Sequence, residues 1–141
     1  MKSRGFTLIE LIIILVIIGI LAVSASPLFI SNSGTQSQTI RLQAMSILRA
    51  VQQQAMQDTT QVYELEVTET TLGVPPYTED NNLQVSSSGD ITFSPVGITI
   101  GFNALGQPTE GCLGGCTITI TESADVSRTI TINKEGFINA Q

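Results

Sequence analysis

Glu10 is the residue whose position most demands a chemical explanation, because it lies near the start of a long run that carries no other charge. The run extends from Phe6 to Ile30 and is otherwise made of apolar residues, glycine and a few small polar residues. A charged side chain costs about 2.5–3.5 kcal/mol at the centre of a bilayer and less near its edge. Since a buried carboxylate needs a partner of opposite charge, we expect Glu10 to meet a cation.

The run itself predicts a membrane span. About 20 mostly apolar residues cross a bilayer as a helix, and the bases Lys2 and Arg4 precede the run. Positive flanks remain cytoplasmic, which places the rest of the chain outside the cytoplasm. A secretory signal cleaved near Val23–Ala25 and a plain uncleaved anchor are the two simpler interpretations. Neither of them accounts for Glu10.

Cys112 and Cys116 are the second pair of residues with possible chemistry. Outside the cytoplasm they lie in an oxidising space. The chain has 2 cysteines and no histidine, so neither a zinc site nor a CxxC redox motif fits well. Two glycines between the cysteines allow a tight turn. We therefore expect a small structural disulfide next to the strand that begins at Thr117.

The remaining polar clusters favour neither catalysis nor nucleic-acid binding. The loop Glu79–Asn82 collects oxygen ligands but lacks the spacing of a calcium-binding EF-hand, so we interpret it as a solvated turn, with calcium as the alternative. The net charge is −6, and beyond residue 49 the only bases are Arg128 and Lys134. Phosphate binding needs several cations. We expect no nucleic acid, no metal, no cofactor and no enzymatic activity.

The residues Gly5–Glu10 read GFTLIE and resemble the class III signal of type IV pilins and type II secretion pseudopilins. In that family a prepilin peptidase cuts after the glycine and methylates the new N-terminus. The resemblance implies cleavage between Gly5 and Phe6, N-methylation of Phe6, and Glu10 as the fifth mature residue, where the family has its signature acid. Gly19 and Pro27 also match positions at which the family has a glycine and a proline.

Cleavage would give Phe6 a free amine, and the amine of a neighbouring subunit could pair with Glu10. A buried ion pair fixes the axial register of apolar helices that could otherwise slide, so we expect Glu10 to guide assembly. The alternative is that Glu10 interacts only with the dipole at its own helix start. Pro27 removes a helical hydrogen bond and Gly19 weakens the helix. We expect Gly19–Pro27 to be extended in a filament and helical in a membrane.

A second helical pattern follows Gly34. Its apolar residues recur at helical spacing on one face, which must be covered by another element; they are Ile40, Ala44, Ile47, Leu48, Val51 and Ala55. The segment Gln57–Thr60 is expected to end this helix. Phe6 to Asp58 would form one long bent helix, about 80 Å if it were continuous.

Alternating strands dominate the rest of the chain and predict an antiparallel sheet that covers the helix stripe. We expect strands at 61–68, 90–94, 97–102, 117–121, 128–133 and 136–139, a hairpin loop at 123–127, and a loop at 72–88. The predicted fold class is α+β. The predicted organisation is a leader at 1–5, a transmembrane or filament-core helix at 6–32, an amphipathic helix at 33–60 and a globular β domain at 61–141.

The C-terminal motifs ITFSPVG, FNALGQP and ITINKEGFI resemble the GspH/FimT group of minor pilins and pseudopilins, and most of all the minor pilins of mannose-sensitive haemagglutinin (MSHA) pili. The resemblance implies a structural subunit for adhesion or pilus initiation. Its partners would be other pilin subunits, prepilin peptidase, the inner-membrane assembly platform and the membrane. Before assembly, the subunit would lie in the inner membrane with a periplasmic C-terminus. After assembly, it would lie in a pilus or pseudopilus. A GspH-like pseudopilin of type II secretion is the near alternative, and a bitopic or secreted binding protein the distant one.

Overall fold

The computed structural model describes residues 6–25, 34–58, 60–87, 90–122 and 126–141. The chain divides into two compact units, residues 1–32 and residues 33–141. The first unit contains helix α1 (Leu8–Ala25), whose sequence is apolar on every side apart from Glu10. The predicted continuity of one helix from Phe6 to Asp58 depends on residues 26–33, which lie outside the described residues.

Helix α2 (Thr35–Gln57) begins the second unit and has the predicted apolar stripe. Ala44, Ile47, Leu48, Val51 and Ala55 are all buried, and Ile40 packs against the same core. The helix ends where predicted, because Asp58 adopts an extended backbone while its N–H still donates to the carbonyl of Gln54. The spacing of apolar residues therefore correctly predicted the buried face of α2, and the segment Gln57–Thr60 correctly predicted its C-terminus.

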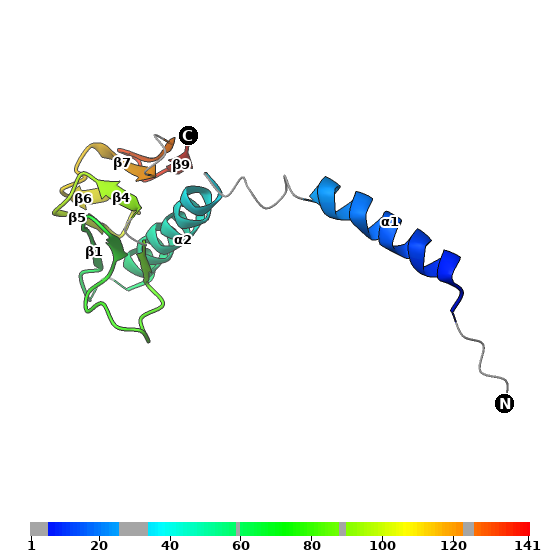
Figure 1. Ribbon diagram of the computed structural model, residues 1–141. Helices are drawn as coiled ribbons and strands as arrows, with labels where there is room; N and C mark the ends of the chain where they lie inside the picture. The colour runs from blue at the N-terminus through cyan, green and yellow to red at the C-terminus, as the bar shows by residue number, and fades with distance from the viewer. Residues whose placement is uncertain (1–5, 26–33, 59, 88–89, 123–125) are drawn as a thin grey trace, which may run out of the picture. The chain divides into compact units, whose positions relative to one another are not determined.

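In the part of the chain that the structure describes, nine strands follow α2 and form two antiparallel sheets, labelled in Figure 1 where there is room. Sheet A has the order β3-β2-β1-β5-β6 and sheet B the order β4-β7-β8-β9. The bounds are β1 Glu64–Val67, β2 Thr71–Gly73, β3 Gln84–Ser86, β4 Ile91–Ser94, β5 Ile98–Phe102, β6 Pro108–Glu110, β7 Gly115–Glu122, β8 Val126–Asn133 and β9 Ile138–Ala140. The predicted α+β fold class is confirmed.

The core of the second unit lies between α2 and both sheets. Helix α2 contacts strands β1, β2, β3 and β5 of sheet A and strands β7, β8 and β9 of sheet B. Alternate residues of the long strands point inward, so Ile118, Ile120, Ile130 and Ile132 are buried while the threonines between them line the other face. Figure 1 shows α2 alongside these strands within the second unit.

Two expectations about the sheet were wrong. The single predicted sheet is two sheets, because β1 pairs with β5 and leaves out β4, which joins β7 instead. The segment 72–88 was predicted to be a loop, yet it contains most of β2 and all of β3. Leu72 and Val85 lie opposite each other in this pair and are both buried. Each strand has only three residues, which is too short for alternation to be recognised.

Candidate functional site

Glu10 lies in the first turn of α1 and forms a reciprocal pair with Thr7. The carboxylate oxygen Oε2 accepts hydrogen bonds from the N–H of Thr7 (3.3 Å) and from its hydroxyl (3.2 Å). The Thr7 hydroxyl oxygen in turn accepts from the N–H of Glu10 (3.3 Å). This is a capping box, in which two side chains satisfy backbone donors at a helix start. Thr7 was not singled out in the sequence, although Thr-x-x-Glu before an apolar run is the signal of such a box.

No described residue supplies a cation to Glu10. The one ion pair among the described residues joins Lys134 to Glu135, at 3.5 Å on an exposed turn. Phe6, whose amine cleavage would expose, is described and its side chain is 81 % exposed, whereas Gly5 lies outside the described residues. The interpretation of Glu10 as a helix-capping residue is thus compatible with the single chain, and its pairing with another subunit stays a prediction.

The surface of α1 is apolar and uncovered within its own unit. Every residue from Leu8 to Leu21 is exposed, and twelve of them are large aliphatic residues. An exposed apolar surface of this kind marks a protein or membrane contact. In the part of the chain that the structure describes, no helix meets the length and hydropathy required of a membrane span.

Gly19 lies within α1, which is helical on both sides of it. A Cβ added at this position would meet nothing within 4 Å, so no contact within the described residues of its own unit requires a glycine here. Pro27, which was predicted to weaken the helix together with Gly19, lies outside the described residues. The expected change from helix to extended chain over Gly19–Pro27 therefore stays a prediction.

The predicted disulfide between Cys112 and Cys116 is present, with an S–S distance of 1.97 Å. Cys112 is buried in the turn after β6, and Cys116 lies near the start of β7. The intervening Gly114 and Gly115 both have positive φ, the left-handed backbone that glycine adopts without a steric cost. The bond therefore fixes the turn to sheet B, as expected for a structural disulfide.

The loop Glu79–Asn82 is organised by hydrogen bonds that do not involve its two acids. The side-chain nitrogen Nδ2 of Asn81 donates to the carbonyls of Val74 (2.6 Å) and Pro76 (2.9 Å). The side-chain oxygen Oδ1 of Asn81 accepts from the N–H of Leu83 (2.9 Å). Among the described residues no cluster of three or more acids, cysteines or histidines could hold a metal ion. Asn81 thus has a structural role in this loop, which its sequence context did not reveal.

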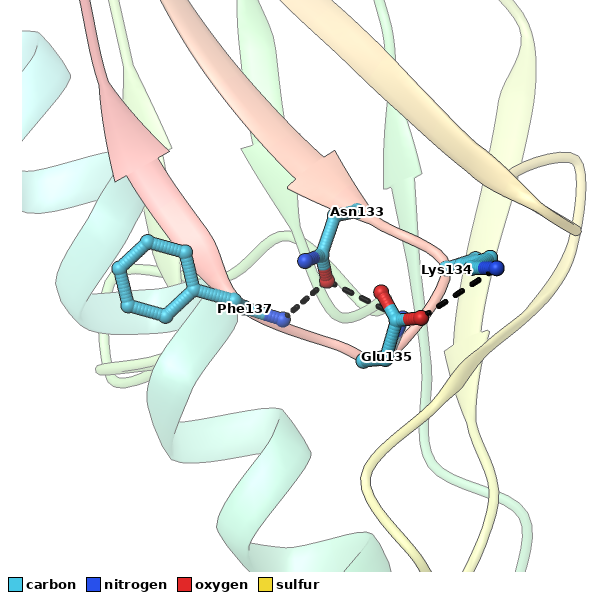
Figure 2. Close-up of polar contacts among 4 residues, drawn as sticks. All are labelled: Asn133, Lys134, Glu135 and Phe137. Carbon is cyan, nitrogen blue, oxygen red and sulfur yellow. Dashed lines mark hydrogen bonds and ion pairs between the residues drawn. The ribbon is translucent and has the colours of Figure 1, made fainter.

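The motifs FNALGQP and ITINKEGFI form the same turn twice. In the first turn, Oδ1 of Asn103 accepts from the N–H groups of Leu105 (3.0 Å) and Gln107 (2.9 Å). In the second, Oδ1 of Asn133 accepts from the N–H groups of Glu135 (3.1 Å) and Phe137 (2.7 Å), as Figure 2 shows. Each turn places a glycine of positive φ three residues after its asparagine. The repeated spacing Asn-x-x-Gly was the sequence signal for this shared geometry.

Gln52 of α2 joins the two turns. Its Nε2 donates to the carbonyl of Gly106 and to the carbonyl of Gly136, both at 2.7 Å. The two turns lie so close that a Cβ added to Gly136 would approach the carbonyl oxygen of Gly106 to 1.9 Å. One helix side chain therefore fixes the end of sheet A against the end of sheet B. Gln52 was not singled out in the sequence, because it lies outside the apolar stripe of this helix.

A second set of contacts holds the start of α2. The buried carboxylate of Glu122 accepts a hydrogen bond from the N–H of Gly34 (3.0 Å). The guanidinium of Arg128 donates to the carbonyl of Gly34 (3.0 Å) and to the hydroxyl of Ser37 (3.2 Å). Arg128, which the sequence analysis considered only as a possible phosphate-binding base, is therefore engaged inside the second unit.

Asp58 and Tyr63 form a small polar site at the C-terminus of α2. Hydrogen bonds from the hydroxyl and N–H of Thr60 and from the hydroxyl of Tyr63 lower the pKa of Asp58 below its ordinary value. The same bond to Asp58, followed by burial, raises the pKa of Tyr63. Both groups keep their ordinary charge at neutral pH, so the site stabilises the chain as it leaves the helix.

Comparison with known proteins agrees with both parts of this description. Residues 1–26 match the family described as the prokaryotic N-terminal methylation motif. Two crystal forms of the type IV minor pilin FimU from Pseudomonas aeruginosa are similar in structure. The P21 form gives a TM-score of 0.56 at 14 % identity over 76 % of this chain and 89 % of that one. The P65 form gives 0.54 at 16 % identity, over 74 % and 91 %.

The search of curated proteins found no match to this sequence. The chain therefore joins a segment similar to the prokaryotic N-terminal methylation motif to a fold similar to that of a type IV minor pilin.

Proposed function

We propose that this protein is a structural, non-enzymatic subunit of a type IV pilus, and specifically a minor pilin. The observation that carries the proposal is the order of its parts: a methylation motif over residues 1–26 includes the apolar helix α1, which is uncovered within its own unit, and an α+β unit similar in fold to FimU follows. An apolar helix with no cover of its own requires other copies or lipid around it. Other pilin subunits, prepilin peptidase, the inner-membrane platform and the membrane are the proposed partners.

The N-terminus of the exported protein tests processing. Cleavage by prepilin peptidase would give a chain that starts with N-methylated Phe6, which mass spectrometry of the N-terminal peptide detects directly. A chain that keeps Met1, or one that starts at Ser26 after cleavage by signal peptidase, contradicts the proposal. The second outcome would support the secreted binding protein instead.

Two substitutions at Glu10 separate its proposed role in assembly from helix capping. Glu10→Gln keeps an oxygen that can accept from Thr7, because glutamine also completes capping boxes, but it removes the charge. Glu10→Ala removes both. If an ion pair with the Phe6 amine of another subunit guides assembly, both variants are processed normally and both are lost from the sheared pilus fraction. Normal assembly of the glutamine variant would show that capping alone suffices.

Within type IV pili, an MSHA-like system and the minor pilin MshC are the finer proposal, supported by the motifs FNALGQP and NKEGFI and the nearby cysteine pair. A GspH-like pseudopilin of a type II secretion system is the alternative, because both kinds of subunit share the N-terminal chemistry. A deletion strain distinguishes them. Loss of surface pili with normal protein secretion supports the pilin, and the opposite result supports the pseudopilin.

A further inference from the structure

Strand β3 forms one edge of sheet A. One side of its backbone is hydrogen-bonded to β2, and the other side faces away from the sheet. The N–H of Val74 donates to the carbonyl of Leu83 (2.9 Å), and the N–H of Ser87 donates to the carbonyl of Thr70 (2.7 Å). Because hydrogen-bonded positions alternate along an antiparallel strand, the backbone groups of Gln84 and Ser86 point away from β2. None of these four groups has a partner among the described residues.

The outer edge of β4 is closed by contacts within the chain. The N–H of Phe93 donates to the carbonyl of Glu69 (2.9 Å). The carbonyl of Ile91 accepts from the hydroxyl of Ser87 (2.5 Å). Proteins generally cover such edges because free strand backbone pairs readily with other chains.

The other two edge strands are each protected in part. Strand β6 begins with Pro108, which has no N–H to offer, and the outward carbonyl of Glu110 accepts from the N–H of Leu113 (3.1 Å). At β9, Arg49 of α2 donates to the carbonyl of Ile138 (3.3 Å). Within the described residues, β3 is therefore the edge strand on which no protecting contact is seen.

A groove of about 320 Å³ lies between β3 and helix α2. Its lining is uncharged and comes from both elements: Gln43, Ser46 and Ile47 from the helix, and Asn82, Gln84, Val85 and Ser86 from the strand region. The side-chain nitrogen of Gln84 donates to the carbonyl of Thr78, but its oxygen Oε1 is buried without a partner. Since buried polar atoms are nearly always hydrogen-bonded, this oxygen marks an unfilled acceptor beside the free backbone groups.

We propose that this groove binds one extended, uncharged peptide segment of a partner protein, which adds to β3 as a further antiparallel strand of sheet A. Gln84 and Ser86 provide the backbone donors and acceptors, as in other cases of strand addition. Ile47 and Val85, both buried, form an apolar floor for its inward side chain.

The shape of the groove favours a single segment over a second copy of this chain. Gln43 and Ser46 of α2 line the side opposite the strand, so a single peptide can enter where a second sheet with its own helix would collide. The absence of charged residues in the lining argues against an acidic or basic segment, which would lose hydration without a counter-charge.

Nuclear magnetic resonance of the full chain in detergent micelles tests this proposal, with the blocked peptide acetyl-Ser-Val-Thr-Val-Thr-Ser-amide as the probe. We expect the amide signals of Gln84 and Ser86 to shift and their hydrogen exchange to slow by about tenfold or more on saturation. The amide of Val85, already paired with β2, should show little change in exchange. The proposal does not depend on the pilin assignment.

Two matched tryptophan variants complete the experiment. Ser46→Trp fills the groove from an exposed position of α2 and should weaken peptide binding by about tenfold or more. Gln53→Trp, also exposed on α2 but outside the groove, should bind as the wild type does. Equal binding by the two variants, or no shift at Gln84 and Ser86 at millimolar peptide, overturns the proposal. So does protection of these amides that rises with protein concentration in the absence of peptide, since it would identify a second copy as the occupant.

Discussion

The close contact between the turns 103–107 and 133–137 predicts a large destabilisation by Gly136→Ala. The new methyl group would lie 1.9 Å from the carbonyl oxygen of Gly106, whereas real Cβ contacts essentially never fall below 3.0 Å. The carbonyl must therefore withdraw by roughly 1 Å, which breaks at least one of the 2.7 Å hydrogen bonds from Gln52. Leaving such a partly buried group unpaired costs about 1–3 kcal/mol.

A second cost arises from the backbone of the same residue. Gly136 has φ +90°, and a left-handed conformation costs a residue with a Cβ about 1–2 kcal/mol. Together the two effects lower the free energy of unfolding by about 2–5 kcal/mol. Gly97→Ala is the matched control, because Gly97 has φ +77° but its added Cβ would meet nothing within 4 Å. Gly97→Ala should therefore lower the free energy of unfolding only by the cost of the left-handed backbone conformation.

Thermal unfolding of the full chain in detergent, followed by near-ultraviolet circular dichroism, measures this difference. For a domain of about 100 residues, 1 kcal/mol corresponds to roughly 4 °C or more in Tm, so Gly136→Ala should melt at least that far below Gly97→Ala. Gln52→Ala should reproduce most of the difference, whereas Gln53→Ala, exposed on the same helix, should not. Equal Tm values for the two glycine variants would refute the inferred contact between the turns.

Two further sites give independent predictions. Replacing both Cys112 and Cys116 by serine should destabilise the chain by about 2 kcal/mol, the entropy of closing so short a loop; a Tm equal to that of the wild type under non-reducing conditions would contradict this. Tyr63→Phe removes a hydrogen bond to Asp58 and should raise the pKa of that carboxyl toward 3.8. Because the folded pKa of Asp58 is depressed, the stability advantage of the wild type over Tyr63→Phe should be full above pH 3.8. It should vanish as pH falls through the folded pKa. Carbon chemical shifts of Asp58 measure the titration, and an unchanged pKa in Tyr63→Phe would contradict the prediction.

Local patterns predicted the elements of this fold well, because burial imposes a regular period on each element. The stripe of α2 and the alternation at 117–121 and 128–133 gave helix and strands close to those observed, although β7 and β8 are longer, at Gly115–Glu122 and Val126–Asn133. Strand β8 begins at Val126, inside the hairpin loop expected at 123–127, while residues 123–125 lie outside the described residues. In the same way the last strand starts at Ile138 rather than at 136.

Pairing between distant segments could not be predicted in this way. That β1 pairs with β5 and β4 with β7 depends on which sheet covers which part of α2, and no local period encodes that choice. The same applies to Gln52, whose importance depends on two carbonyls 54 and 84 residues away in the chain. The edge of β3 was missed because three residues bordered by polar loops carry no detectable alternation.

Glu10 was predicted to have either a partner in another subunit or a role at its own helix start, and the capping box shows how one residue could serve both roles in turn. Thr7 holds the carboxylate beside the first turn of α1, one residue from Phe6. Both of the hydrogen bonds from Thr7 use the same oxygen, Oε2. The other oxygen accepts no hydrogen bond from the described residues, so an ammonium group could bind it without first opening the box. In the proposed filament, Thr7 would therefore orient the carboxylate before its partner arrives, which makes the capping box part of assembly rather than an alternative to it.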